Sequence, residues 1–292
     1  MRSTFSRQVN CWKLKIGPFN VNLNSNVPSI SRHIEKLYQD YPLVLDDNPI
    51  DFYIAITRGG GFRYFYRPQV NFSFDGQKPF APLPLTQAAG MFEWGLNWCV
   101  ANTAHQFLII HAVVVEKNGI VLILPGTPGS GKSTLCASLI CQGWRLFSDE
   151  MALCSLEDGL IYPIPRPVSL KNQSIQIINE ISRGIEFGQV ISNTVKGDIA
   201  HMRVPKSAIV DQDLAIAPAF LIFPRYSPNS EAKLDVIPKS RALMMLVENS
   251  FNFNTLGDVA FECAVNLIDN VDCYSFEYPD LSASNKGLSS LF

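Results

Sequence analysis

The 292-residue sequence predicts an α/β fold, and three observations support this class. Residues 120–124 form a short, fully apolar run, which is typical of a strand buried on both faces. A glycine-rich segment follows this run, and after it apolar residues recur at helical spacing up to Gly143. A further short strand is predicted in "WRLFSDE" at 144–150, so that strand, loop, helix and strand alternate along the chain.

Changes in sequence character divide the chain into two predicted units. Residues 1–84 are expected to form a small N-terminal α/β region, and residues 85–292 the second unit. In the first, we expect a helix at 33–38 and a hairpin of two aromatic runs, 51–58 and 62–74, joined by three glycines. The proline-rich stretch 76–86 resembles a linker.

Residues 86–102 are apolar nearly all round a helix, which predicts a buried connecting helix. Trp94 and Trp98 lie four residues apart on it. We interpret this pair as core packing rather than as a platform for stacking bases.

Composition limits the classes of partner. With 47% hydrophobic residues, 17% charged residues and a net charge of -2, the chain offers a large core and no electrostatic argument for nucleic acid or an anionic membrane. Seven cysteines without a C-x-x-C pair indicate reduced core thiols. No secretory signal and no apolar run of membrane-spanning length is present, so we expect a cytoplasmic protein.

The central motif follows a predicted hairpin around Asn118-Gly119, in a run that begins at residue 107. Residues 126–133 match the phosphate-loop pattern G-x-x-x-x-G-K-[ST] between a strand and a helix, which predicts binding of a nucleoside triphosphate. Glycines let backbone N–H groups turn toward phosphates, Lys132 reaches the β- and γ-oxygens, and Ser133 offers a hydroxyl to Mg²⁺. The predicted nucleotide-binding residues are Gly126, Thr127, Pro128, Gly129, Ser130, Gly131, Lys132, Ser133 and Thr134.

Two acids, Asp149 and Glu150, end the strand that follows the loop helix. An acid at this place can face the metal ion of a bound nucleotide. The alternative is a solvated turn acid or a helix N-cap.

Together these elements resemble bacterial HPr kinase/phosphorylase. The resemblance is carried by His111 in "LIIHAVVV", by the phosphate loop, and by "GWRLFSDE", where Glu150 replaces the second Asp of the family element. "LPGTPGSGKSTLC", "GWRLFSDE" and "RPVSLKN" at 166–172 are similar to the HPr-kinase-related kinase A group. The likeness extends over about residues 86–280 and is specific at 107–172.

The resemblance implies a P-loop kinase core of the phosphoenolpyruvate-carboxykinase type. It implies that Asp149 takes the proton of the substrate hydroxyl, that Glu150 supports Mg²⁺ with Ser133, and that His111 lies near the γ-phosphate. For His111 a satisfied core histidine is the alternative. Since the glycine- and arginine-rich signature that follows the active site in HPr kinases is not recognisable, HPr itself is not implied as the acceptor.

Three further residues are candidates for contact with the substrate or for a lid. Arg166 and Lys171 precede a predicted helix and would neutralise phosphoryl charge if this segment folds over the site. The alternative is a helix start capped at Ser169 or Asn172 with solvated cations. His201 belongs to the glycine-containing segment 183–205, which is either a lid or a surface excursion.

The sequence thus predicts an ATP- and Mg²⁺-dependent kinase that phosphorylates a hydroxyl, with serine in a protein or peptide as the expected acceptor. A nucleotide-binding regulatory module without turnover and a small-molecule kinase are the alternatives. The resemblance implies a homo-oligomer, since HPr kinases assemble as hexamers.

Overall fold

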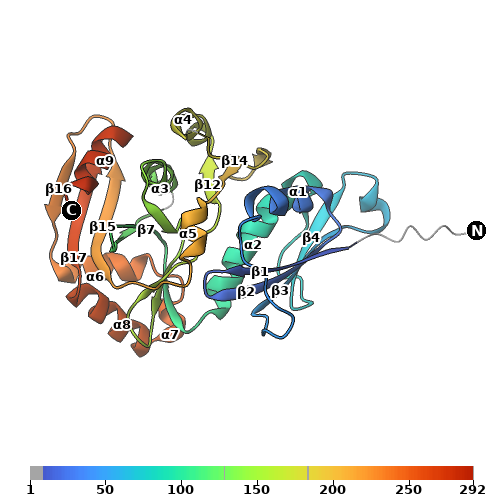
Figure 1. Cartoon of the computed structure of the whole chain (residues 1–292), viewed down its shortest axis with the longest axis horizontal. Helices are drawn as coiled ribbons and strands as arrows, with labels where there is room; N and C mark the ends of the chain where they lie inside the picture. Colours follow the sequence, from blue (N-terminus) through green and yellow to red (C-terminus); the bar gives the residue numbers. More distant parts are fainter. Residues whose placement is uncertain (1–8, 128, 183, 292) are drawn as a thin grey trace, which may run out of the picture.

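The structure is a computed structural model, and it describes residues 9–127, 129–182 and 184–291. The fold is mixed α/β, the class predicted from the sequence, and the described residues form four sheets. Figure 1 shows two parts side by side: a sheet with helices α1 and α2 from the N-terminal region, and a larger part that contains the phosphate-loop segment.

The N-terminal sheet has the strand order β1-β2-β3-β4-β5, with β2 and β3 parallel and the other pairs antiparallel. Alternate residues of β2 are buried, which is the pattern of a sheet covered on one face. Helices α1 and α2 cover that face (Figure 1). The elements are β1 (Asn10–Ile16), β2 (Phe19–Ser25), α1 (Pro28–Leu37), β3 (Phe52–Arg58), β4 (Gln69–Phe74), β5 (Leu83–Pro84) and α2 (Ala88–Thr103).

Two predictions for this region need correction. The hairpin of β3 and β4 exists, but "FRYFY" is not strand: η1 (Gly61–Tyr64) occupies it, and Phe62 and Phe65 are exposed. The linker-like stretch is packed, because β5 pairs with β4 and Phe80 contacts the rings of Trp94 and Trp98 at 4.1 and 5.1 Å between centroids. Both tryptophans therefore pack against the protein, although Trp94 keeps 46% exposure. After β5, η2 (Leu85–Gln87) leads into α2.

The largest sheet has the order β16-β17-β15-β8-β7-β9. Strand β15 runs parallel to both β8 and β17, and the other pairs are antiparallel. The β7–β8 hairpin turns at Asn118 and Gly119 with φ of 54° and 81°, the type of turn that the Asn-Gly pair predicts. The strands are β7 (Ala112–Lys117), β8 (Ile120–Pro125), β9 (Arg145–Ser148), β15 (Pro218–Tyr226), β16 (Lys233–Val236) and β17 (Asp272–Tyr278).

Both faces of this sheet are buried. Leu122 and Leu124 of β8 face one core, which includes α3 and α9, while Val121 and Ile123 face the other, which includes α6 and α8. This confirms that β8 is buried on both sides. The helices are α3 (Lys132–Cys141), α4 (Gln173–Ile181), α5 (Lys206–Val210), α6 (Lys239–Glu248), α7 (Phe253–Leu256), α8 (Asp258–Asp269) and α9 (Leu281–Ser289).

Two three-stranded sheets complete the fold, in the orders β11-β10-β6 and β12-β14-β13. The second corrects the loop expected at 183–205, because part of this segment forms the β13–β14 hairpin and β14 is the central strand of a sheet. The strands are β6 (Phe107–Ile110), β10 (Ala152–Ser155), β11 (Ile161–Tyr162), β12 (Val168–Lys171), β13 (Ile191–Thr194) and β14 (Gly197–Met202).

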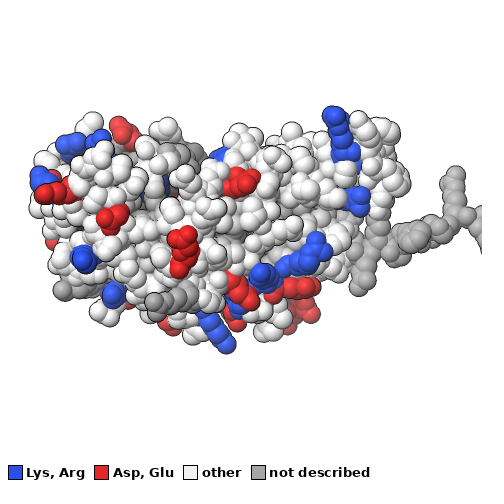
Figure 2. Space-filling view, turned by 90° about the horizontal axis from the view of Figure 1, so that it is seen from above, with Lys and Arg blue, Asp and Glu red and all other residues white. Residues whose placement is uncertain are grey.

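On the face in Figure 2, lysines and arginines are dispersed among acidic side chains, and most of the surface carries neither charge. All seven cysteines are free, and five of them are buried. Within the described ranges, none of the helices has the length and apolar character needed to cross a membrane.

Candidate functional site

The phosphate-loop segment connects the end of buried strand β8 to the first turn of α3. Gly131 has a φ of 88° at the start of α3, in the left-handed region that favours glycine. A Cβ there would also lie 3.2 Å from the hydroxyl of Tyr278. A Cβ on Gly126 would lie 3.1 Å from Ser130 Oγ. The loop therefore favours glycine at position 131, and a side chain at position 126 would require Ser130 Oγ to move; Pro128 lies outside the described residues.

Lys132 points into this loop. Its ammonium donates to the carbonyl oxygen of Gly126 and, at 3.1 Å, to that of Thr127. Burial lowers the pKa of Lys132 to about 8, although the carboxylates of Asp149 and Glu150 act in the opposite direction. The loop thus encloses the ammonium of Lys132, and the carboxylates of opposite charge lie at the end of β9.

Hydroxyl residues of the predicted nucleotide-binding set lie in the loop and in the first turn of α3. Ser130 Oγ is buried and has no hydrogen-bond partner among the described residues. Ser133, in the first turn of α3, lies close enough to Asp149 for its hydroxyl to lower the pKa of that carboxyl. Thr134 follows it and is half-buried.

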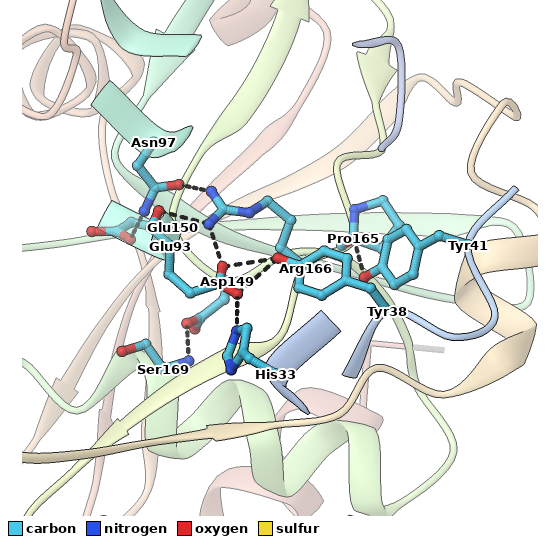
Figure 3. Close-up of polar contacts among 10 residues, drawn as sticks. All are labelled: His33, Tyr38, Tyr41, Glu93, Asn97, Asp149, Glu150, Pro165, Arg166 and Ser169. Carbon is cyan, nitrogen blue, oxygen red and sulfur yellow. Dashed lines mark hydrogen bonds and ion pairs between the residues drawn. The ribbon is translucent and has the colours of Figure 1, made fainter. Parts of the chain in front are cut away.

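Asp149 comes directly after β9 and is 8% exposed. Its Oδ2 accepts a hydrogen bond from the backbone N–H of Ser169 at 2.9 Å (Figure 3). Its Oδ1 is buried and has no hydrogen-bond partner within the described ranges. Burial raises the pKa of Asp149 to about 6, and neighbouring Glu150 acts in the same direction. One oxygen is thus held in place while the other keeps its hydrogen-bonding capacity.

Glu150 is oriented by a chain of side chains that reaches back to α2. Asn97 donates to Glu150 Oε2, and Arg166 donates to Asn97 Oδ1 (Figure 3). Arg166 also donates to the backbone carbonyl and the carboxylate of Glu93, at 2.7 and 2.5 Å. Since Glu93 and Asn97 lie one helical turn apart on α2, the same face of that helix holds both contacts.

Glu93, Arg166, His33 and Tyr38 form a buried cluster, here called the Glu93 cluster. Tyr38 donates to both carboxylate oxygens of Glu93 at 2.8 and 2.9 Å, and His33 Nε2 lies 2.7 Å from Oε1 (Figure 3). Burial acts to raise the pKa of Glu93, but Arg166 and His33 hold it well below its usual range. The cluster therefore contains an ionised carboxylate with few contacts to solvent.

His111 lies between β6 and β7 and not inside a strand. Its ring packs against Phe251 at 5.3 Å between centroids. Burial and the charge of Lys132 lower the pKa of His111 to about 4, so its imidazole is neutral at pH 7. His111 is thus a neutral group packed against an aromatic ring.

The structure separates the three residues predicted to contact the substrate. Lys171 lies at the exposed end of β12, two residues after Ser169, whose backbone N–H donates to Asp149. Arg166 is 7% exposed and paired with Glu93, so neither free contact with phosphates nor a solvated cation describes it.

His201 also differs from its prediction as a lid residue. It is 3% exposed on β14, and its ring lies 5.6 Å from that of His33. Burial lowers the pKa of His201 to about 4.

Sequence reasoning missed Glu93, Asn97 and the backbone N–H of Ser169. A signal for the first two exists, because they are polar residues four apart on a helix that is otherwise largely apolar.

The residues present fit a nucleotide and Mg²⁺. The Lys132 ammonium, the N-terminus of α3 and the backbone N–H groups of the loop suit phosphates. The buried Oδ1 of Asp149 and the Ser133 hydroxyl are oxygen donors of the kind that Mg²⁺ prefers. Within the described ranges, no group of three or more His, Cys, Asp or Glu side chains forms a metal site by itself. Mg²⁺ is commonly bound through one or two carboxylates plus phosphates, so it does not require a cluster of this kind.

No protein-family model and no curated protein matches the chain. Among solved structures, the chain is similar to the HPr(Ser) kinase/phosphatase from Coxiella burnetii, with 14% sequence identity and a TM-score of 0.29. The match covers 63% of this chain and 96% of that one. A TM-score this low supports no inference about function, so the proposal below depends on the chain's own residues.

Proposed function

We propose that the chain is a kinase that binds ATP with Mg²⁺ and transfers the γ-phosphate to a hydroxyl, with a serine of a protein or peptide as the expected acceptor. The observation that carries this proposal is Asp149, a buried carboxylate near the phosphate-loop lysine, with one oxygen held by Ser169 and the other without a partner among the described residues. A solvated turn acid would be exposed, and Asp149 is not.

Phosphate binding would fall to the loop and the start of α3. The backbone N–H groups at the start of α3 offer donors, and the N-terminus of this helix offers the positive end of its dipole. Lys132 already points into the loop, and an anion there would raise its pKa from about 8. Lys171 adds a second positive charge at the exposed edge of the site.

Ser133, Asp149 and Glu150 would hold Mg²⁺. When bound, this ion neutralises phosphate charge and orients the phosphates. Glu150 is held for this role by Asn97, which in turn is held by Arg166.

In the transfer step, Asp149 accepts the proton of the acceptor hydroxyl. The hydroxyl oxygen forms a bond to the γ-phosphorus as the bond from that phosphorus to the bridging oxygen of ADP breaks. Lys132 and the loop N–H groups stabilise the charge that develops on the leaving diphosphate. The Ser169 N–H keeps the carboxylate of Asp149 in one orientation, so catalysis is mostly positioning and charge neutralisation.

The order of His111, loop, helix and acid pair supports a P-loop kinase core of the HPr-kinase type for this part of the chain. The cytoplasmic location and the homo-oligomer expected from the sequence belong to the same proposal.

The test is label transfer from γ-labelled ATP with Mg²⁺ into an extract of the source cells, with labelled species identified by mass. We expect wild type to label one protein or peptide and Asp149→Asn to lose the label while keeping its affinity for ATP. Asp158→Asn, which alters an exposed turn acid, is the matched control and should label as wild type does.

Each other outcome has a distinct meaning. ATP binding without any label that depends on Asp149 would contradict the kinase and favour a regulatory module. A labelled small molecule in place of a protein would favour a small-molecule kinase. Failure of wild type to bind ATP would overturn the proposal as a whole.

A further inference from the structure

An exposed tyrosine lies beside the phosphate loop, at the end of β15. Tyr226 is 53% exposed, and its Cβ lies 3.6 Å from the position that a Cβ on Gly131 would take. Exposure of a single aromatic residue is ordinary. Its place next to the first turn of the loop helix is what calls for an explanation.

Strand geometry explains why Tyr226 reaches the loop. Strand β15 is parallel to β8, with Leu221 opposite Ile123, so both strands end at the same edge of the sheet. Two residues further on, β8 ends at Pro125, whereas β15 continues to Tyr226. At about 3.3 Å per residue, β15 extends roughly 10 Å beyond β8 and flanks the loop.

The side chain of Tyr226 shares a face of the sheet with α3. Residues two apart on a strand lie on the same face, and Ile222 belongs to the core that contains Leu135 of α3. Tyr278, the parallel neighbour on β17, is 1% exposed and lies 5.9 Å from Tyr226 between ring centroids. A buried ring thus supports one side of an exposed ring.

The sheet also places Tyr226 and Asp149 on opposite sides of β8. Strand β15 lies next to β8 on one side, and β9, which leads to Asp149, lies beyond β7 on the other. If the γ-phosphate is directed toward Asp149, the opposite end of the nucleotide extends toward β15. That end carries the base, which has flat apolar faces suited to a tyrosine ring.

We propose that Tyr226 is the stacking platform for the nucleobase of the bound triphosphate, an assignment that rests on the function proposed above. Stacking of this kind contributes to affinity without reading the hydrogen-bonding edge of the base. Tyr226 therefore contributes to ATP binding and takes no part in contacts to the phosphates.

The experiment compares two ligands, MgATP and magnesium tripolyphosphate, which has the phosphates and lacks the nucleoside. Calorimetric titration gives the dissociation constants of both for wild type, Tyr226→Ala and Tyr226→Phe. We expect Tyr226→Ala to weaken ATP binding about 5- to 150-fold and to leave tripolyphosphate binding within about twofold. Tyr226→Phe keeps the ring and should bind both ligands as wild type does.

The matched control is Tyr53→Ala, which removes a tyrosine of equal exposure (52%) from β3 of the N-terminal sheet and should change neither constant. Equal weakening of both ligands by Tyr226→Ala, or no effect on ATP, would overturn the stacking assignment. Wild type that binds neither ligand would instead overturn the proposed function. Far-ultraviolet circular dichroism of each variant establishes that it is folded.

Discussion

Replacement of Arg166 by Met should strongly destabilise the protein, because it leaves a buried carboxylate without its cation. Arg166 makes three contacts, with the carboxylate and the backbone carbonyl of Glu93 and with Asn97. Both charged side chains are less than a tenth exposed. Removal of one partner from a buried ion pair costs about 3–5 kcal/mol, whereas a whole domain is stable by only about 5–15 kcal/mol.

Two contacts reduce this cost without removing it. Tyr38 and His33 still hydrogen-bond to Glu93 in the variant, and each such bond to a charged group contributes about 1.5–3 kcal/mol. Both bonds also exist in wild type, so they limit rearrangement but do not replace the lost positive charge. We therefore expect a loss of about 3 kcal/mol or more.

The assay is equilibrium unfolding in urea at pH 7, with a double-mutant cycle on Glu93 and Arg166. Glu93→Gln leaves the arginine without its counter-charge and should also destabilise. The double variant carries neither charge, so its loss should be well below the sum of the two single losses. Lys13→Met is the control, because its ion pair with exposed Asp46 should contribute no more than about 1 kcal/mol. A loss under about 1 kcal/mol for Arg166→Met, or strictly additive losses in the cycle, would refute the reasoning.

Two further predictions concern stability. In the metal-free protein, burial raises the pKa of Asp149 to about 6 from 3.8, so stability should fall as pH rises from about 4 to about 6, and Asp149→Asn should remove this dependence. At pH 7.5 that variant should be more stable by on the order of 3 kcal/mol, which thermal melting across pH would measure; a variant with unchanged pH dependence would contradict the assignment. Gly95→Ala places a Cβ 2.1 Å from the ring of Phe72 and should cost about 1–3 kcal/mol in urea unfolding. Gly90→Ala on the same helix meets only the end of Ile191 at 3.3 Å, and equal losses for the two variants would show that this clash is not the cause.

Local patterns predicted the part of the site that is contiguous in sequence. Strand β8, the loop and α3 follow from an apolar run, three glycines and a helical stripe within about twenty residues, and the structure contains them in that order. The Asn118-Gly119 turn and the end of α3 at Gly143 were also predicted, because each depends on a backbone conformation that only a few residue types adopt readily.

The predictions of secondary structure were wrong where tertiary contacts determine the local conformation. The run "FRYFY" has the composition of a strand, but η1 takes its place and three of its aromatic side chains are exposed. His201 follows glycines that suggest a loop, yet its strand is the centre of a sheet. Neither outcome can be read from residues within one helix or strand. The predicted boundary between residues 84 and 85 stays a prediction.

Arg166 shows why composition alone misassigns a charged residue. Its partner Glu93 lies 73 positions earlier in the chain, and no local pattern indicates that the two would meet. Replacement of a buried ion pair by apolar side chains of similar volume is often neutral or stabilising, so stability alone does not require the Glu93 cluster. What the cluster does fix is the orientation of Glu150. Arg166, held by Glu93, orients Asn97, and Asn97 orients Glu150 at the end of β9. The helix that covers the N-terminal sheet therefore sets the position of an acid in the candidate site, and the geometry of that acid depends on a residue outside the phosphate-loop motif.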